Sequence, residues 1–241
     1  MSNTTRAEPV RRRSVLAAGI ALVSTIESQD ALADNPPLSR KQQAIAPIGA
    51  AMAVGDMPRL ATALHEGLDA GLTVSDAKEI LVQLYAYTGF PRSLNALGEL
   101  MKVLDARRQR GVQDAPGCNP GPVPTGKELL AAGTANQTRL SGAPVRGALF
   151  EFAPAIDEYL KTHLFGDIFG RDNLDWQSRE LATVGALSAL SGVESQLRSH
   201  VRISMNVGLT AEQLRGAADV LAQRGQGDAA RRVQAALEKD R

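Results

Sequence analysis

The sequence predicts an all-α protein, a helical bundle made of two degenerate repeats. Its 241 residues are 44% hydrophobic but only 4% aromatic, so the interior has to be built from aliphatic side chains. Runs rich in Ala and Leu favour helices, and no stretch shows the alternation of apolar and polar residues typical of a half-buried strand. Capping residues and glycines divide these runs into segments of helical length.

The region 34–110 is expected to form the first repeat, with four helical segments. Each segment carries a Ser or Thr cap or a first-turn proline near its start, and each ends at a glycine. In order they read PPLSRKQQAIAPIGAAMAVGD, MPRLATALHEGLDAG, TVSDAKEILVQLYAYTG and PRSLNALGELMKVLDARRQRG.

Residues 111–126 are rich in Pro and Gly and are expected to be a linker. This linker contains Cys118, a single cysteine that can form no internal disulfide. Helices resume in the region 127–241, the second repeat. Its segments read GKELLAAGTANQTRL, FAPAIDEYLKTHLFG, RELATVGALSALSGVESQLRSHVRISMN, TAEQLRGAADVLAQRG and DAARRVQAALEKDR.

The two halves repeat one pattern of glycines and caps. A shift of 137 positions (210 − 73 = 137) lays Gly55 on Gly192 and Gly71-Leu72-Thr73 on Gly208-Leu209-Thr210. The same shift places Glu180 on Gln43 and His200 on Ala63. The first copy therefore lacks both polar groups, which indicates one active copy and one scaffold copy.

Residues 1–33 have the features of an export signal. Three arginines at 11–13 precede an apolar stretch from Val15 to Ile26, and Ala31-Leu32-Ala33 is a small-x-small cleavage site. The Arg-Arg pair and the Ala/Gly-rich apolar stretch resemble a twin-arginine signal, and an ordinary secretory signal is the alternative. We expect an exported protein, periplasmic or extracellular.

The composition limits the partners of the mature chain. With 27 Lys and Arg against 26 Asp and Glu, the net charge is +1. This balance gives no electrostatic reason to expect nucleic acid or an anionic membrane as a partner. Beyond the signal, no stretch is long and apolar enough to suggest a membrane span.

A glutamate and a histidine lie on opposite arms of the hairpin predicted around Gly192. Glu180 lies twelve positions before this glycine and His200 eight after it. At about 1.5 Å of rise per residue, their heights along the hairpin differ by about 6 Å, which long side chains or a ligand can bridge. A carboxylate and an imidazole bordering apolar surface form a candidate acid–base pair. The alternative places Glu180 favourably in the first helical turn and His200 partly exposed.

These residues carry a family resemblance. The stretch SRELATVGALSALSGVESQLRSHVRISMNVGLT resembles the signature of the carboxymuconolactone decarboxylase family, which shares its all-helical fold with the AhpD-like peroxidase proteins. The lead-in APAIDEYLKTHLFGDIFGRDNLDWQSRE and the segment QLYAYTGFPRSLNAL are also similar to parts of that family. Together these resemblances cover most of residues 38–222. They imply two family units and a homo-oligomer, a trimer or a hexamer.

The resemblance also implies which chemistry to expect. The peroxidase branch of the family uses a Cys-x-x-Cys with a nearby Glu and His, whereas the sequence between Glu180 and His200 contains no cysteine. The decarboxylase branch keeps only the Glu and the His. It implies a cofactor-free and metal-free lyase acting on a small carboxylated lactone or related acid, with Glu180 and His200 as catalytic residues. Arg92 is a candidate anchor for a substrate carboxylate, and a surface residue at a helix start is the alternative.

Two other functions stay open at this point. One is a peroxide-handling oxidoreductase, which the missing cysteine pair disfavours. The other is a non-catalytic, oligomeric binding protein. The aromatic residues Tyr87, Phe165, Phe169 and Trp176 are expected in the core or in a pocket wall.

Overall fold

A computed structural model describes residues 36–239, which lie within one compact unit, Asn35–Arg241. This part of the chain is helical and contains no strand, so the predicted all-α class is confirmed. The export signal expected at 1–33 lies outside the described residues. The helices are α1 Arg40–Gln43, α2 Ile45–Val54, α3 Met57–Asp69, α4 Val74–Gln83, α5 Tyr85–Thr88, α6 Phe90–Gln109, α7 Gly126–Ser141, α8 Ala148–Phe152, α9 Pro154–Tyr159, the π-helix η1 Leu160–Ile168, α10 Trp176–Ala189, α11 Glu194–Asn206, α12 Ala211–Gln223 and α13 Gly227–Glu238.

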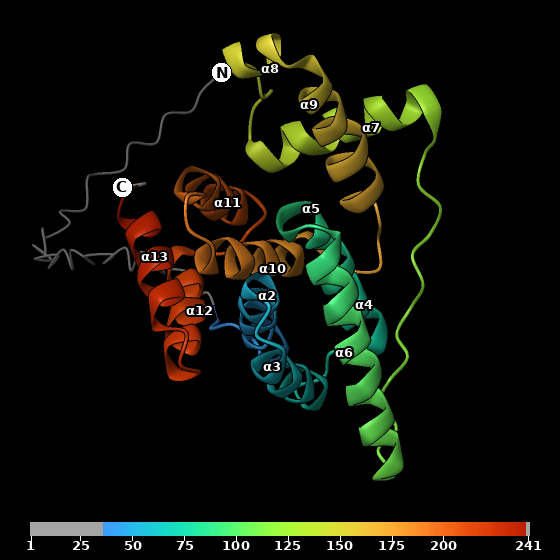
Figure 1. The fold of residues 1–241 in the computed structure, drawn as a ribbon. Coiled ribbons are helices and arrows are strands. Elements are labelled where there is room, and N and C mark those ends of the chain that lie inside the picture. The colour runs from blue at the N-terminus through green and yellow to red at the C-terminus, as the bar shows by residue number, and fades with distance from the viewer. Residues whose placement is uncertain (1–35, 240–241) are drawn as a thin grey trace, which may run out of the picture. The chain divides into compact units, whose positions relative to one another are not determined.

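Helices α2 and α10 pack against each other at the centre (Figure 1). Their backbones approach closely because glycines lie at the contact: a Cβ added to Gly185 would lie 2.2 Å from the Ala46 carbonyl oxygen, and one added to Gly49 would lie 2.4 Å from the Ala182 oxygen. Nine of the ten residues of α2 are buried, as expected of a helix that is apolar on all sides. Glu180, which belongs to the site described below, therefore lies on one helix of this central pair.

The remaining helices pack around this pair. Helices α11 and α13 contact α10, and α13 also packs on α12 (Figure 1). On the other side α4 and α5 contact α10, and α6 packs on α3, α4 and α5. Helices from both halves of the sequence thus surround α10.

The shift of 137 positions noted in the sequence also relates the helix bounds. It carries Met57–Asp69, the whole of α3, onto Glu194–Asn206, the whole of α11. It also carries the first residue of α4 onto the first residue of α12. Both of these helices begin with a capping box, formed by Thr73 and by Thr210, in which the threonine hydroxyl accepts a hydrogen bond from the N3 backbone amide.

A smaller apolar cluster lies where α7 packs on η1. The sequence predicts one continuous helix over FAPAIDEYLKTHLFG, but the structure forms α9 and then a π-helix from Leu160. The close approach of the two backbones depends on Gly133 of α7, because a Cβ there would lie 1.7 Å from the Lys161 carbonyl oxygen. Hydrophobic periodicity gives no indication of this change in winding.

The segment between α6 and α7 forms no helix over residues 112–125 and runs along the start of α4. The backbone amides of Val74 and Ser75 donate to the carbonyl oxygens of Ala115 and Pro116, at 2.9 and 3.0 Å. Cys118 lies in this segment as an exposed free thiol. Within residues 36–239 no helix has both the length and the apolar character that crossing a bilayer would take.

Candidate functional site

The structure brings Glu180 and His200 into direct contact. Glu180 lies in the second turn of α10, a helix that Asp175 caps by accepting a hydrogen bond from the Ser178 amide at 2.8 Å. His200 lies in the middle of α11, and its Nδ1 is 2.8 Å from the Glu180 Oε2 atom. Glu180 is completely buried and His200 is 8% exposed. The alternative that left His200 partly exposed and Glu180 in the first helical turn therefore does not describe this pair.

The contact sets the hydrogen-bonding roles of the imidazole. When Glu180 is ionised, its carboxylate can only accept, and His200 Nδ1 is then the donor of this bond. The other ring nitrogen, Nε2, makes no hydrogen bond to any described residue. The imidazole is thus oriented by a buried carboxylate, and its second nitrogen is not engaged by another side chain of residues 36–239.

Tyr87 of α5 completes the surroundings of this pair. Its ring meets the His200 ring edge-on, with centroids 5.3 Å apart and an interplanar angle of 81°. The Tyr87 hydroxyl and the Glu180 Oε1 atom are both buried, and neither has a hydrogen-bond partner in the described part of the chain. Burial and the nearby Glu180 charge raise the Tyr87 pKa well above its ordinary value, although the neighbouring Thr183 lowers it. The phenol therefore stays protonated at neutral pH and remains a hydrogen-bond donor.

A buried ionic network fixes the start of α10, next to Glu180. The Arg179 side chain is fully buried, and its Nη2 donates to Glu79 of α4 at 2.9 Å while its Nη1 donates to Gln83 at 3.0 Å. Arg171 binds the same Glu79 carboxylate through two further bonds, at 2.8 and 3.0 Å. Burial raises the pKa of Glu79, but the Arg171 and Arg179 guanidinium groups outweigh it and hold this pKa below its ordinary value.

The network connects to the pair through Thr183 and Gln83. The Gln83 amide nitrogen donates to the Arg179 carbonyl oxygen at 2.8 Å and to Thr183 Oγ1 at 2.9 Å. Thr183 is one helical turn from Glu180 and lowers the pKa of the Tyr87 hydroxyl. Helix α4 and helix α10 are therefore held in register beside the pair by polar contacts. Sequence reasoning missed this network, and its only signal was Arg179, an arginine at the start of the largely apolar run RELATVGAL.

The other residues singled out in the sequence lie apart from this contact. Arg92 is in the first turn of α6, half-buried, and makes no hydrogen bond or ion pair with Glu180 or His200. Phe165 and Phe169 are buried with their centroids 5.5 Å apart, and the Trp176 Nε1 donates to the Phe169 carbonyl oxygen at 2.9 Å. These three aromatic residues belong to the apolar cluster between α7 and η1, in agreement with a core role.

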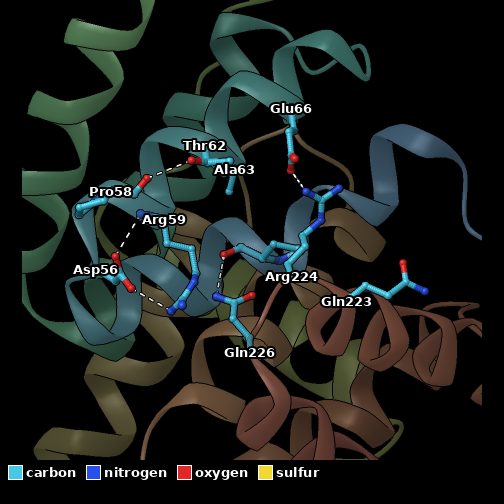
Figure 2. A pocket seen from close by; sticks show the side chains of 10 residues that line it. Asp56, Pro58, Arg59, Thr62, Ala63, Glu66, Gln223, Arg224 and Gln226 are labelled. Atoms are coloured by element: carbon cyan, nitrogen blue, oxygen red, sulfur yellow. Dashed lines mark hydrogen bonds and ion pairs between the residues drawn. The ribbon is translucent and has the colours of Figure 1, made fainter.

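A surface pocket of about 680 Å³ lies elsewhere, against α3 and the turn between α12 and α13 (Figure 2). Neither residue of the Glu180–His200 pair lines it. No group of three or more His, Cys, Asp or Glu side chains suited to a metal ion occurs among residues 36–239.

Fold and site together define an all-α protein with a buried carboxylate–imidazole pair that bridges two consecutive helices. Residues 154–239, from α9 to α13, match the model of the carboxymuconolactone decarboxylase family, and this matched segment contains Glu180 and His200. The comparison with curated proteins found no match for the chain. Tyr87, Glu79 and Arg92 lie outside the matched segment.

Proposed function

We propose that this protein is a cofactor-independent lyase that acts on a small carboxylated lactone or a related acid, with Glu180 and His200 as its acid–base pair. The observation that carries the proposal is the 2.8 Å contact between the two side chains, inside the segment that matches the family. Because the carboxylate is fully buried and the imidazole is not, Glu180 orients His200 and does not itself meet the substrate first.

The chemistry requires one bond to break and one to form. The bond between the substrate carboxylate and its neighbouring carbon breaks, CO₂ leaves, and the electron pair moves into a conjugated carbonyl group to give an enolate. Protonated His200 then transfers the proton on Nε2 to carbon, and Glu180 stabilises the imidazolium through Nδ1. The imidazole regains its proton from water, which completes the cycle.

Tyr87 is suited to stabilise the enolate oxygen. Its hydroxyl is buried, has no partner among the described residues, and remains protonated because its pKa is raised. A donor that is already oriented in a site of low dielectric stabilises a developing oxyanion more strongly than water does. Arg92 remains a candidate for holding the substrate carboxylate, as a guanidinium that forms no ion pair within the described chain.

A peroxidase is the second candidate, and the sequence disfavours it. The chain holds a single cysteine, Cys118, which is exposed and lies in the segment before α7 rather than between Glu180 and His200. A thiol peroxidase of the Cys-x-x-Cys type needs a second thiol to resolve the oxidised first one. Replacement Cys118→Ser should therefore leave any peroxide-consuming activity unchanged.

The experiment is a substrate screen with purified protein. Carboxylated lactones and related keto acids are incubated with the native chain, and CO₂ release is measured. Replacement His200→Ala or Glu180→Gln should lower the rate by about 100-fold or more, the range expected for loss of general acid–base catalysis. His65→Ala on α3, a half-buried histidine, is the matched control and should retain the native rate.

Two results of this screen would contradict the proposal. If no compound releases CO₂ with the native protein, the lyase assignment is wrong. If the native and His200→Ala proteins release CO₂ at equal rates, the reaction does not use this pair. A binding protein without catalysis would give the first result while still binding members of the panel.

We also infer export and self-association. The export signal is a sequence pattern at 1–33, and cell fractionation with the Arg12→Lys, Arg13→Lys double replacement tests its route. Self-association is supported by an exposed apolar stripe on α6, where Phe90, Leu94 and Met101 are 62%, 64% and 67% exposed. Light scattering should give a trimer or a hexamer, and Leu94→Glu should dissociate it if this stripe is the interface.

A further inference from the structure

The pocket of about 680 Å³ is separate from the Glu180–His200 pair, neither member of which lines it. It lies between α3 and the turn that joins α12 to α13 (Figure 2). Two prolines and an alanine form its apolar part, and two arginines, two acidic residues and glutamines form its polar part. The volume lies within the range of about 300–1,000 Å³ that small-molecule sites occupy.

The internal repeat relates this pocket to the Glu180–His200 pair. The shift of 137 positions carries Ala63 onto His200, and it carries Tyr87 onto Arg224. In the later half, His200 of α11 faces Tyr87, which comes from the earlier half. In the earlier half, Ala63 of α3 and Arg224 from the later half line one pocket. Ala63 therefore has the position in its half that His200 has in the other.

One lining side chain carries a buried polar atom without a partner. Gln226 is 8% exposed, and its Oε1 atom has no hydrogen-bond partner among the described residues. The amide cannot simply be turned over, because its nitrogen faces the Pro47 carbonyl oxygen at 3.4 Å, and that oxygen cannot donate. A ligand with an N–H or O–H group would satisfy Oε1, whose burial without a partner is unfavourable.

Two guanidinium groups lie beside this amide. The Arg59 Nη1 donates to Asp56 at 2.8 Å, and the Arg224 Nη1 forms an ion pair with Glu66. In Figure 2 the Arg59 side chain extends toward Gln226, while the Arg224 guanidinium is directed at Glu66. Each arginine uses one nitrogen on its carboxylate, so further N–H groups remain available to an anionic oxygen.

The lining therefore offers an acceptor and several cationic donors together. We propose that this pocket binds a small carboxylate that also carries a hydroxyl or amino group. The carboxylate would bind the free N–H groups of Arg59 and Arg224, and the hydroxyl or amino group would donate to Gln226 Oε1. Because two acidic residues balance the two arginines, a ligand that both donates and accepts fits better than a simple anion.

The test uses four small probes and the native chain. Lactate and alanine carry both groups, acetate carries only the carboxylate, and propan-2-ol carries only the donor. Titrations are followed by the backbone amide signals of the pocket residues in NMR spectra. Lactate or alanine should shift the signals of Ala63 and Gln226, with acetate and propan-2-ol binding at least tenfold more weakly. Binding of lactate alone or of alanine alone identifies the hydroxyl or the amino group as the preferred donor.

Variants connect the binding to the proposed contacts. Gln226→Leu and Arg224→Gln should each lower the affinity for the preferred probe by about tenfold, the loss expected for one hydrogen bond to a charged group. Arg215→Gln, on α12 outside the pocket, is the matched control and should bind as the native chain does. CO₂ release from any substrate of the Glu180–His200 pair should be unchanged in the pocket variants, which separates this proposal from the lyase.

Three results would overturn the inference. The first is that neither lactate nor alanine shifts the pocket signals. The second is that acetate binds as tightly as both, which would indicate a simple anion contact. The third is native affinity in both Gln226→Leu and Arg224→Gln, with the fold of each variant checked by circular dichroism.

Discussion

Replacement Glu79→Gln should strongly destabilise the fold, and the structure allows the size of the effect to be worked out. The replacement keeps the shape of the side chain but removes the charge that faces two arginines. Arg171 has a side chain that is 35% exposed, so water screens much of its pair with Glu79, and that pair contributes about 1 kcal/mol or less. Arg179 is fully buried, so its guanidinium would lose its counter-charge without gaining solvent.

Loss of one partner from a buried ion pair costs about 3–5 kcal/mol. Domains of this kind unfold with a total of about 5–15 kcal/mol, so the variant should lose a large fraction of its stability. The assay is urea-induced unfolding followed by far-UV circular dichroism at neutral pH. Glu99→Gln on α6 is the matched control, because the ion-pair partner of Glu99, Lys102, has a side chain that is 76% exposed. This replacement should lower the free energy of unfolding by less than about 1 kcal/mol. A cost below about 1 kcal/mol for Glu79→Gln would refute the reasoning.

Three further predictions concern the site, the helix packing and pH. Tyr87→Phe should lower lyase turnover while raising stability by about 1 kcal/mol, because it removes a buried hydroxyl without a partner; a loss of stability in urea unfolding would contradict this. Gly185→Ala should cost about 1–3 kcal/mol of stability, since its new methyl group would lie 2.2 Å from a backbone oxygen of α2. Gly216→Ala on α12, where nothing lies within 4 Å, should be stabilising in the same assay. The folded-state pKa of Glu79 lies below its ordinary value of 4.5. The ionised carboxylate therefore contributes fully to the stability of the fold above pH 4.5, and this contribution is lost as the pH falls through the folded-state pKa. Native stability measured against pH should therefore fall steeply in acid, and the Glu79→Gln profile should be shallower.

The helical class and the punctuation of the chain were predictable from sequence because they depend on local chemistry. Thr73 and Thr210 form capping boxes in the structure, and Gly55 and Gly192 take φ angles of 74° and 79°, which only glycine adopts without strain. Each feature involves neighbours within a few positions, so the residues themselves indicate it.

The Glu180–His200 contact was predicted as a pairing across one helical hairpin, but its geometry was not. Spacing gave an axial difference of about 6 Å and left direct contact open. The structure closes that gap to a 2.8 Å hydrogen bond and buries the carboxylate completely. The pair lies where α10 meets α11, which carries His200, and the ring of Tyr87 packs against it from α5, a helix far away in the sequence.

The rest of the site was decided by tertiary structure alone. Glu79 reaches Arg179 across a separation of 100 positions, and Tyr87 meets His200 from a helix in the other half of the chain. The pocket of about 680 Å³ is likewise lined by residues from both halves of the chain, among them Ala63 and Arg224. By itself the sequence determined the helices, their ends and which two polar residues share a hairpin, because those depend on short-range propensities. Only the folded chain determined which distant groups are buried together, because burial depends on how the helices pack.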